Sequence, residues 1–288
     1  RDVLGSRGLG DVYKRQMEER TKKINWYPGH MKVAMRELKM MLSKIDVVIY
    51  ILDARAPISS INPSLSHLAK GKQILYVINK IDLADKARVN EILKDFARRG
   101  LSYVTMNSTT IGNDKLIKSK IKQLCQKKIE KSQGKLINPV IRAVVVGVPN
   151  CGKSTFINSL LRKAKMVTGN RPGVTKSAKL MKIGDNIEIF DTPGTLYPNL
   201  QDQSVAKKLF FIGSIKDEIM KDICPLAEDL LEMINERYPS LLQARYGDDL
   251  SLEGIAKRRN YILSKDEFDL ERTAMAVIDD FRKGRIGK

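Results

Sequence analysis

The sequence contains few cysteines and no long hydrophobic run. Its three cysteines, Cys125, Cys151 and Cys224, are an odd number at unrelated spacings. They argue against a disulfide framework or a cysteine-based metal site and favour a reducing compartment. No apolar stretch approaches the roughly 20 residues that a membrane-spanning helix requires, and no segment has the pattern of a secretory signal. We therefore expect a cytoplasmic protein with no membrane association.

Acidic residues are scarce relative to basic ones. The chain has 33 Asp and Glu residues against 52 Lys and Arg residues, which gives a formal net charge of +19. Such an excess indicates a polyanionic partner, either nucleic acid or an anionic membrane surface. Because the sequence has no basic amphipathic anchor and no lipidation signal, it favours nucleic acid.

The most informative motif lies near the middle of the chain. An apolar run over residues 140–146 predicts a buried strand, Gly-Val-Pro-Asn-Cys-Gly-Lys-Ser follows at 147–154, and a helical pattern comes next. This order is typical of a phosphate-binding loop, whose backbone N–H groups surround the phosphates of a nucleoside triphosphate. The alternative is a glycine-rich structural turn. The residues predicted to bind nucleotide here are Asn150, Cys151, Gly152, Lys153, Ser154 and Thr155, with Lys153 near the β- and γ-phosphates and Ser154 on Mg²⁺.

A second motif predicts which base is bound. The apolar run over residues 73–78 predicts a strand that ends at Asn79-Lys80-Ile81-Asp82, which resembles the guanine-specificity motif Asn-Lys-x-Asp. The Asp82 carboxylate can accept hydrogen bonds from the guanine ring N–H and the exocyclic amine, a donor pair that adenine lacks. We expect Asn79 to tie this loop to the phosphate loop and the Lys80 stem to cover one face of the base.

Two further strand ends are predicted to carry polar contacts. The run over residues 46–52 ends at Asp53-Ala54-Arg55-Ala56-Pro57, at the edge where α/β sheets place ligand contacts. The run over residues 101–106 ends at Asn107 and Ser108, whose placement suits the loop that contacts the guanine carbonyl.

The segments after the phosphate loop supply candidate switches. Thr175, in the polar segment 170–175, is the candidate that closes on Mg²⁺ and the γ-phosphate. A predicted hairpin over residues 179–190 ends in Asp-Thr-Pro-Gly at 191–194. Asp191 would hold Mg²⁺ through water, and the Gly194 N–H would sense the γ-phosphate. The predicted metal ligands are therefore Ser154, Thr175 and Asp191.

Beyond residue 199 the patterns are helical, over residues 205–215, 217–237, 250–258 and 268–282. We interpret this part as a small all-helical domain with a basic, RNA-contacting surface. The basic residues assigned to that surface are Lys257, Arg258, Arg259, Arg272, Arg282, Lys283 and Arg285.

The order of the motifs is unusual for a small GTPase, because the guanine motif precedes the phosphate loop. The same sheet forms if the chain is circularly permuted, which α/β folds tolerate. The chain resembles the circularly permuted GTPases of the YlqF/RbgA type, the bacterial ribosome-biogenesis GTPase A family. The resemblance covers residues 25 to about 282 and is carried by Asn25-Trp26-Tyr27-Pro28-Gly29-His30-Met31, the Asp53 to Pro57 motif and every nucleotide motif in permuted order.

The resemblance implies a GTPase that acts late in assembly of the large (50S) ribosomal subunit, binds rRNA, is stimulated by the ribosomal particle and leaves on GTP hydrolysis. Thr195 lies where Ras-type enzymes carry a water-orienting glutamine and is too short for that role; it also departs from the family's apolar residue. The family is thought to use the His of Pro-Gly-His, which implies a water-positioning role for His30. Residue type alone would make that His structural. Asn150 matches an asparagine that helps coordinate K⁺ in related GTPases.

The prediction is thus an α/β fold, with a mostly parallel sheet covered by helices on both faces and a small all-α C-terminal domain. Residues 1–16 are expected to be a non-native extension, residues 17–200 the permuted GTPase domain, and residues 201–288 the helical domain. The predicted catalytic residues are His30, Lys153, Thr175 and Gly194, and a monomer is expected. Two alternatives stay open: a nucleotide-gated RNA-binding switch with incidental hydrolysis and, disfavoured by charge, a membrane-linked signalling GTPase.

Overall fold

The computed structural model describes residues 29–110, 114–133, 139–161, 179–184, 186–194, 202–264 and 267–287. These residues form two compact units. The sheet unit comprises the described residues up to 194 together with residues 212–215, and the helical unit comprises residues 202–211 and 216–287. The predicted extension over residues 1–16 lies outside the described residues. The predicted boundary near residue 200 did not anticipate that residues 212–215 group with the sheet.

A six-stranded sheet forms the core of the sheet unit, in the order β3-β2-β1-β4-β6-β5. Neighbouring strands are parallel except in the β5–β6 hairpin. The central strands are β-branched runs with buried side chains, as a parallel sheet covered by helices requires. This confirms the predicted α/β fold. The strands are β1 (Val47–Asp53), β2 (Gln73–Asn79), β3 (Ser102–Thr105), β4 (Ile141–Gly147), β5 (Lys179–Ile183) and β6 (Ile187–Asp191).

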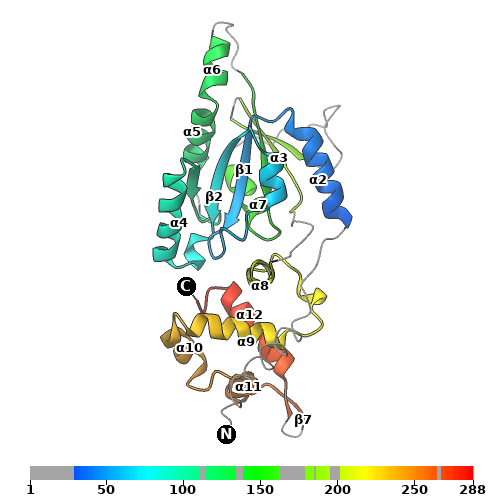
Figure 1. Cartoon of the computed structure of the whole chain (residues 1–288), viewed down its shortest axis with the longest axis vertical. Helices are drawn as coiled ribbons and strands as arrows, with labels where there is room; N and C mark the ends of the chain where they lie inside the picture. The colour runs from blue at the N-terminus through cyan, green and yellow to red at the C-terminus, as the bar shows by residue number, and fades with distance from the viewer. Residues whose placement is uncertain are drawn as a thin grey trace, which may run out of the picture. The chain divides into compact units, whose positions relative to one another are not determined.

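Helices flank this sheet (Figure 1), and α4 and α5 contact β3 and β2 while α7 contacts β4 and β6. Two of them begin at side-chain caps: Asn62 accepts backbone hydrogen bonds at the start of α3, and Asp85 does so at the start of α4. The helices are α2 (Gly29–Leu42), α3 (Pro63–Leu68), α4 (Lys86–Arg98), α5 (Asp114–Leu124), α6 (Gln126–Gln133) and α7 (Lys153–Leu161), with a 3₁₀ turn η1 (Ile81–Leu83).

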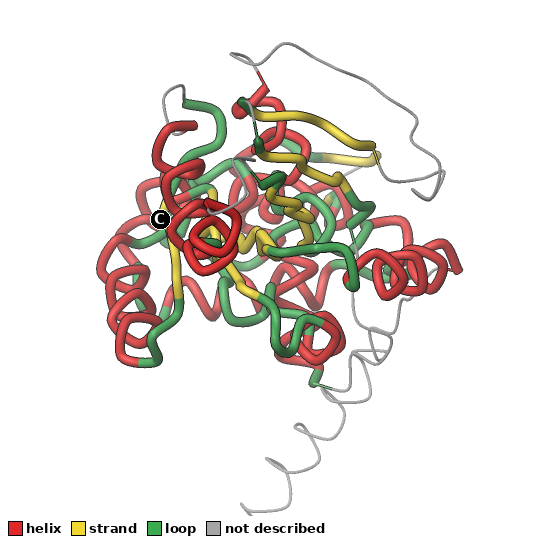
Figure 2. Tube along the Cα trace, turned by 90° about the horizontal axis from the view of Figure 1, so that it is seen from above, coloured by secondary structure: helices red, strands yellow, loops and turns green. Residues whose placement is uncertain are grey.

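The carboxyl ends of four neighbouring parallel strands meet at one edge of this sheet, whose strands lie side by side in Figure 2. Asp53 at the end of β1 lies opposite Asn79 at the end of β2. On the other side of β1, Gly147 at the end of β4 lies opposite Ile51. Asp191 closes β6, the next strand. The permuted motifs therefore converge on a single edge, because strands distant in the sequence are neighbours in the sheet.

The helical unit departs from the sequence pattern in four places. The predicted helix over 205–215 ends at Phe211, because Gly213 has a positive φ of 79° that a helix does not accommodate. The predicted helix over 217–237 is a 3₁₀ turn followed by α9, with Pro225 in the first turn of α9. A helix, α10, and a short hairpin, β7–β8, were not predicted.

The elements of the helical unit are α8 (Gln203–Phe211), η2 (Asp217–Ile219), α9 (Cys224–Asn235), α10 (Pro239–Tyr246), α11 (Leu252–Arg259), β7 (Ile262–Ser264), β8 (Glu267–Phe268) and α12 (Leu270–Arg282). Its core forms where α12 packs against α9 and α11, with Leu230, Ile255 and Val277 fully buried. Within the part of the chain that the structure describes, no helix is long and apolar enough to cross a membrane.

Candidate nucleotide site

The phosphate loop leaves the end of β4 and leads into α7, and two glycines allow its close packing. A Cβ atom at Gly147 would lie 2.6 Å from the Ile51 carbonyl oxygen. Gly152 has a positive φ of 97°, and a Cβ atom there would overlap the side-chain nitrogen of Asn79. Both positions exclude a side chain, so the Gly-x-x-x-x-Gly spacing reflects backbone packing as well as phosphate binding.

The first turn of α7 presents the polar groups that the motif predicts. Lys153 is buried, and its Nζ donates hydrogen bonds to the carbonyls of Gly147 (3.2 Å) and Val148 (3.0 Å). Ser154 and Thr155 are exposed beside it. The Lys153 charge is thus held inside the loop, next to the N-terminus of α7. The lysine charge and the helix N-terminus both favour binding of an anion there.

Asn79 links the guanine motif to the phosphate loop. Its Nδ2 donates to the Cys151 carbonyl at 3.0 Å, and its Oδ1 accepts from the Ser108 backbone N–H at 2.9 Å and from the Ser108 hydroxyl at 2.8 Å. Asn79 and Ser108 are both buried. The Asn79 amide therefore joins the guanine motif, the phosphate loop and the loop at Ser108, and both its donor and its acceptor are hydrogen-bonded. Removing a buried amide of this kind is costly, because its partners lose their hydrogen bonds.

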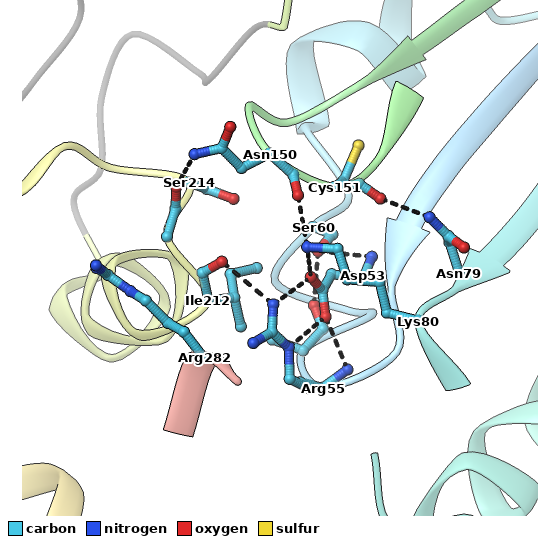
Figure 3. Close-up of polar contacts among 12 residues, drawn as sticks. Asp53, Arg55, Ser60, Asn79, Lys80, Asn150, Cys151, Ile212, Ser214 and Arg282 are labelled. Atoms are coloured by element: carbon cyan, nitrogen blue, oxygen red, sulfur yellow. Dashed lines mark hydrogen bonds and ion pairs between the residues drawn. The ribbon is translucent and has the colours of Figure 1, made fainter. Parts of the chain in front are cut away.

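Lys80 belongs to a charge cluster that the sequence did not predict (Figure 3). Its Nζ lies 3.0 Å from a carboxylate oxygen of Asp53 and donates to the Asn150 carbonyl at 2.6 Å. Arg55 binds the same carboxylate through Nε (2.9 Å) and Nη2 (2.7 Å). Burial alone would raise the pKa of the Asp53 carboxyl, but hydrogen bonds and charge from Arg55 and Lys80 outweigh burial and lower it. Asp53 is therefore an ionised, fully buried anchor.

Residues 212–214 bind the same region. The Asn150 Nδ2 donates to the Gly213 carbonyl at 2.6 Å, and the Ser214 hydroxyl donates to the Pro149 carbonyl at 2.8 Å. Arg55 Nη2 donates to the Ile212 carbonyl at 3.2 Å. Sequence reasoning assigned this segment to a helix, and the only available signal was Gly213-Ser214 interrupting the helical pattern.

The switch strand reaches the same loop. Asp191 ends β6, and the Thr192 hydroxyl donates to the Val145 carbonyl of β4 at 2.6 Å. A Cβ atom at Gly194 would lie 2.8 Å from the Pro149 Cα and 2.9 Å from the Lys153 Nζ. The structure thus brings Gly194 into direct contact with the phosphate loop, next to the lysine predicted to bind the γ-phosphate.

Several predicted residues are not part of this contact network. Asp82 lies exposed in η1, and the Asn107 side chain caps its own turn by accepting from Thr109. His30 lies in the first turn of α2, but its side chain lies outside the described part of the structure. Thr175 and Thr195 are outside the described residues.

Cys151 is the phosphate-loop thiol. Its side chain is fully buried, and burial raises the pKa of the thiol above its ordinary value, although the Lys153 charge acts in the opposite direction. The loop cysteine is therefore a neutral packing group, with its backbone carbonyl engaged by Asn79.

Many of the basic residues predicted to contact RNA are engaged within the helical unit. Asp280 is buried and accepts hydrogen bonds from Arg259 (2.6 Å), Arg285 (2.9 Å) and Arg245 (2.9 and 3.0 Å), and from the Tyr246 hydroxyl (2.9 Å). Burial would raise the pKa of Asp280, but these donors outweigh it and hold the pKa well below its usual range. The cluster ties α10, α11 and α12 together.

The remaining basic residues divide into paired and exposed groups. Arg282 binds Asp217 at 2.7 Å and the Phe210 carbonyl at 2.8 Å, and Lys283 binds Asp279 at 2.7 Å. Lys257 and Arg258 are exposed, and the ion pairs among the described residues do not include them. Arg272 is exposed and lies over the Tyr261 ring, 4.3 Å from its centroid. Of the seven predicted residues, those that are exposed and outside the described ion pairs are Lys257, Arg258 and Arg272, which we call the exposed basic surface.

A phosphate loop, a guanine motif and an Asp-x-x-Gly switch share one sheet edge in permuted chain order, and this combination defines a circularly permuted GTPase. The family of 50S ribosome-binding GTPases matches residues 142–242, from the phosphate-loop strand into the helical unit. The matched segment contains the phosphate loop and the switch motif but begins after the guanine motif, as permutation requires.

Relatives extend the match over both units. The ribosome biogenesis GTPase A of Bacillus cereus is 37% identical over 273 residues, which cover 92% of this chain and 92% of that protein. The chain belongs to the ribosome biogenesis GTPase A family. The GDP-bound structure of TM YlqF is 25% identical with a TM-score of 0.61 and covers 88% of this chain and 96% of its own. GNP-bound YlqF from T. maritima is 24% identical, with the same TM-score, and covers 88% and 95%.

The packing of Gly152 against Asn79 leads to a testable prediction. Gly152→Ala should lower GTP affinity by at least about tenfold, because the new methyl group displaces the Asn79 amide and with it the loop backbone. The measurement is titration with a fluorescent GTP analogue, together with thermal unfolding.

The matched control is Gly184→Ala in the β5–β6 turn. Gly184 also has a positive φ, of 66°, but no atom lies within 4 Å of a Cβ built there. This variant should lose about 1 kcal/mol of stability through backbone strain alone and keep its GTP affinity. Equal loss of affinity in both variants would contradict the packing argument.

Proposed function

We propose that this GTPase is an assembly factor for late maturation of the large (50S) ribosomal subunit, binding rRNA and leaving the particle when GTP is hydrolysed. The observation that carries the proposal is the 92% mutual coverage with the Bacillus cereus ribosome biogenesis GTPase A, because it includes the helical unit as well as the nucleotide site. The net charge of +19 supports an RNA partner. We also propose that the protein is a monomer and that it acts in the cytoplasm.

In the proposed reaction, water attacks the γ-phosphate and GDP leaves. The Asp82 carboxylate selects guanine, and Lys153 and the Gly194 N–H stabilise the charge that develops on the γ-phosphate oxygens. A Cβ atom at Gly194 would lie 2.9 Å from the Lys153 Nζ, and this proximity supports the division of roles. Thr175 would close over the same phosphate. Because no arginine finger or glutamine is evident in the sequence, intrinsic turnover should be slow, and a partner could add a factor of ~10³–10⁵.

A divalent cation fits the residues at this edge. Ser154 lies in the first turn of α7, after β4, and Asp191 is the last residue of the neighbouring parallel strand β6. They offer a hydroxyl and a carboxylate, the oxygen ligands that Mg²⁺ prefers. We assign Mg²⁺ to these two residues and Thr175; when bound, it neutralises charge on the phosphate oxygens. Asn150 is the candidate K⁺ ligand, and the engagement of its Nδ2 by Gly213 leaves its Oδ1 as the oxygen that could coordinate a cation.

The water-positioning role is assigned to His30. A neutral imidazole can accept a hydrogen bond from water and orient it toward phosphorus. His30 lies in the first turn of α2, and Thr195 cannot replace the glutamine used by Ras-type enzymes.

The proposal is tested by GTP hydrolysis at fixed K⁺ and Mg²⁺, with purified large subunits, with small subunits, and without either. We expect strong stimulation by the large subunit and none by the small one. Tight GTP binding with no stimulation by large subunits would contradict the ribosomal assignment.

The rival function is a nucleotide-gated RNA-binding switch whose hydrolysis is incidental, and His30→Ala separates it from the proposal. If hydrolysis drives release, this variant should keep its GTP affinity and remain bound to the large subunit in the presence of GTP. Release at the wild-type rate, with hydrolysis abolished, would favour the switch. Cosedimentation with ribosomal subunits measures the bound fraction.

The exposed basic surface of Lys257, Arg258 and Arg272 provides a separate test of RNA binding. The double variant Lys257→Ala/Arg258→Ala should weaken binding to rRNA and reduce the slope of log K against log salt by about 1.4 to 1.8, since each phosphate contact contributes about 0.7 to 0.9. The control is Arg98→Ala/Arg99→Ala on α4, which removes two exposed charges of the same sign. If both pairs change the slope equally, net charge and not this surface determines binding.

A further inference from the structure

Residues 212–214 bind the phosphate loop although 63 to 65 positions separate the paired residues. The segment lies between α8 and η2, both of which belong to the helical unit, yet it groups with the sheet unit. Ile212, Ser214 and Ile215 are 3%, 2% and 0% exposed. This is a firmly packed connection.

Three hydrogen bonds fix the segment, and each is made with a different residue. Gly213 accepts from the Asn150 side chain, Ser214 donates to the Pro149 carbonyl, and Ile212 accepts from Arg55. Two of them act on consecutive residues of the phosphate loop. Because a carbonyl can only accept, the Gly213 bond also determines which end of the Asn150 amide faces the segment.

The opposite side of the same loop residue is held by the Asp53 cluster. Lys80 donates to the Asn150 carbonyl, and its ammonium is held by Asp53, which in turn holds Arg55 (Figure 3). The contacts therefore form a closed ring that runs from the phosphate loop through the guanine-motif lysine, Asp53 and Arg55 to residues 212–214 and back to the loop. The ring therefore connects residues 149–150 of the loop to Arg55 and to residues 212–214.

Pro149 is also in contact with the predicted switch. The atoms around Gly194 place it against the Pro149 backbone and the Lys153 ammonium. Residue 149 is thus packed by Gly194 and hydrogen-bonded by Ser214. A small shift of this residue would alter where the Gly194 N–H meets a γ-phosphate, and misplacement of such a group by about 1 Å costs up to about 100-fold in rate.

We propose that Ser214 and Arg55 are positioning residues for GTP hydrolysis, which hold residues 212–214 against the phosphate loop and so set the geometry of Pro149 and Asn150 required for turnover. Neither is assigned contact with the nucleotide. The segment continues covalently into α8 and η2 on its two sides. The inference requires only GTP hydrolysis and is independent of the ribosomal assignment.

The test compares Ser214→Ala with the wild type by steady-state hydrolysis of GTP, nucleotide affinity and thermal unfolding. We expect kcat to fall about five- to tenfold, the loss of one buried hydrogen bond, with GTP and GDP affinities changed less than about threefold. Ser214→Thr, which keeps the hydroxyl donor, should restore most of kcat.

Thr273→Val is the matched control. Thr273 is also fully buried, and its hydroxyl donates to the Asp269 carbonyl at 2.7 Å, within the helical unit. This variant should lose a similar amount of thermal stability and keep kcat. If Ser214→Ala behaves like Thr273→Val, with kcat within twofold of wild type, the positioning role is refuted.

Arg55→Lys provides a second, independent measurement. Lysine keeps a charge near Asp53 but cannot bind the carboxylate and the Ile212 carbonyl together. It should lower kcat as Ser214→Ala does. Because both variants release the same segment, the double variant should lose less than the product of the single effects. A fully multiplicative loss would show that the two residues act separately and would overturn the shared role.

Discussion

The parallel pairing of β1 with β4 is the contact on which the rest of the sheet unit depends. It joins the strand that leads to Asp53 with the strand that leads to the phosphate loop, and the paired residues are 96 positions apart in the sequence. Without this pairing the sheet would separate into two halves, one with the guanine motif on β2 and the other with the switch on β6. Parallel strands need long crossover connections in any case, so moving the chain ends costs the sheet little. The permuted chain order is therefore compatible with the same arrangement of motifs at the carboxyl edge of the sheet, where Asn79 and Gly152 are in contact.

Much of this edge follows from local sequence, and the remainder does not, for a physical reason. Apolar β-branched runs predict β1, β2 and β4, and the motifs at their ends could be placed because parallel strands end at a common edge. The Asp53–Arg55–Lys80 cluster depends on two strands being neighbours and on a buried carboxylate needing two cations. The Ser214 contact depends on a turn at Gly213 inside an otherwise helical pattern. Neither pairing leaves a periodic signal.

The partners of the basic residues also could not be predicted from the sequence. A count of charges predicts an anionic partner for the whole chain but cannot distinguish a free arginine from one that neutralises a buried carboxylate. Asp280 engages three arginines and Asp217 engages Arg282, so four guanidinium groups of the helical unit pair with carboxylates inside that unit. Periodicity placed α12 correctly, but the hydrogen-bond partners of its polar face come from α8, η2, α10 and α11. Among the basic residues that the sequence assigned to an RNA-contacting surface, those outside the described ion pairs are at the end of α11 and at Arg272.

The buried thiol at the centre of the phosphate loop has a consequence for redox chemistry. Oxidation to a sulfenic acid or a mixed disulfide requires an accessible thiolate. Cys151 is inaccessible and its pKa is raised by burial. A cysteine in direct contact with the nucleotide-binding backbone would otherwise make GTP turnover sensitive to peroxide. Cys151 therefore contributes a small, well-packed side chain to the loop and is a poor target for oxidation.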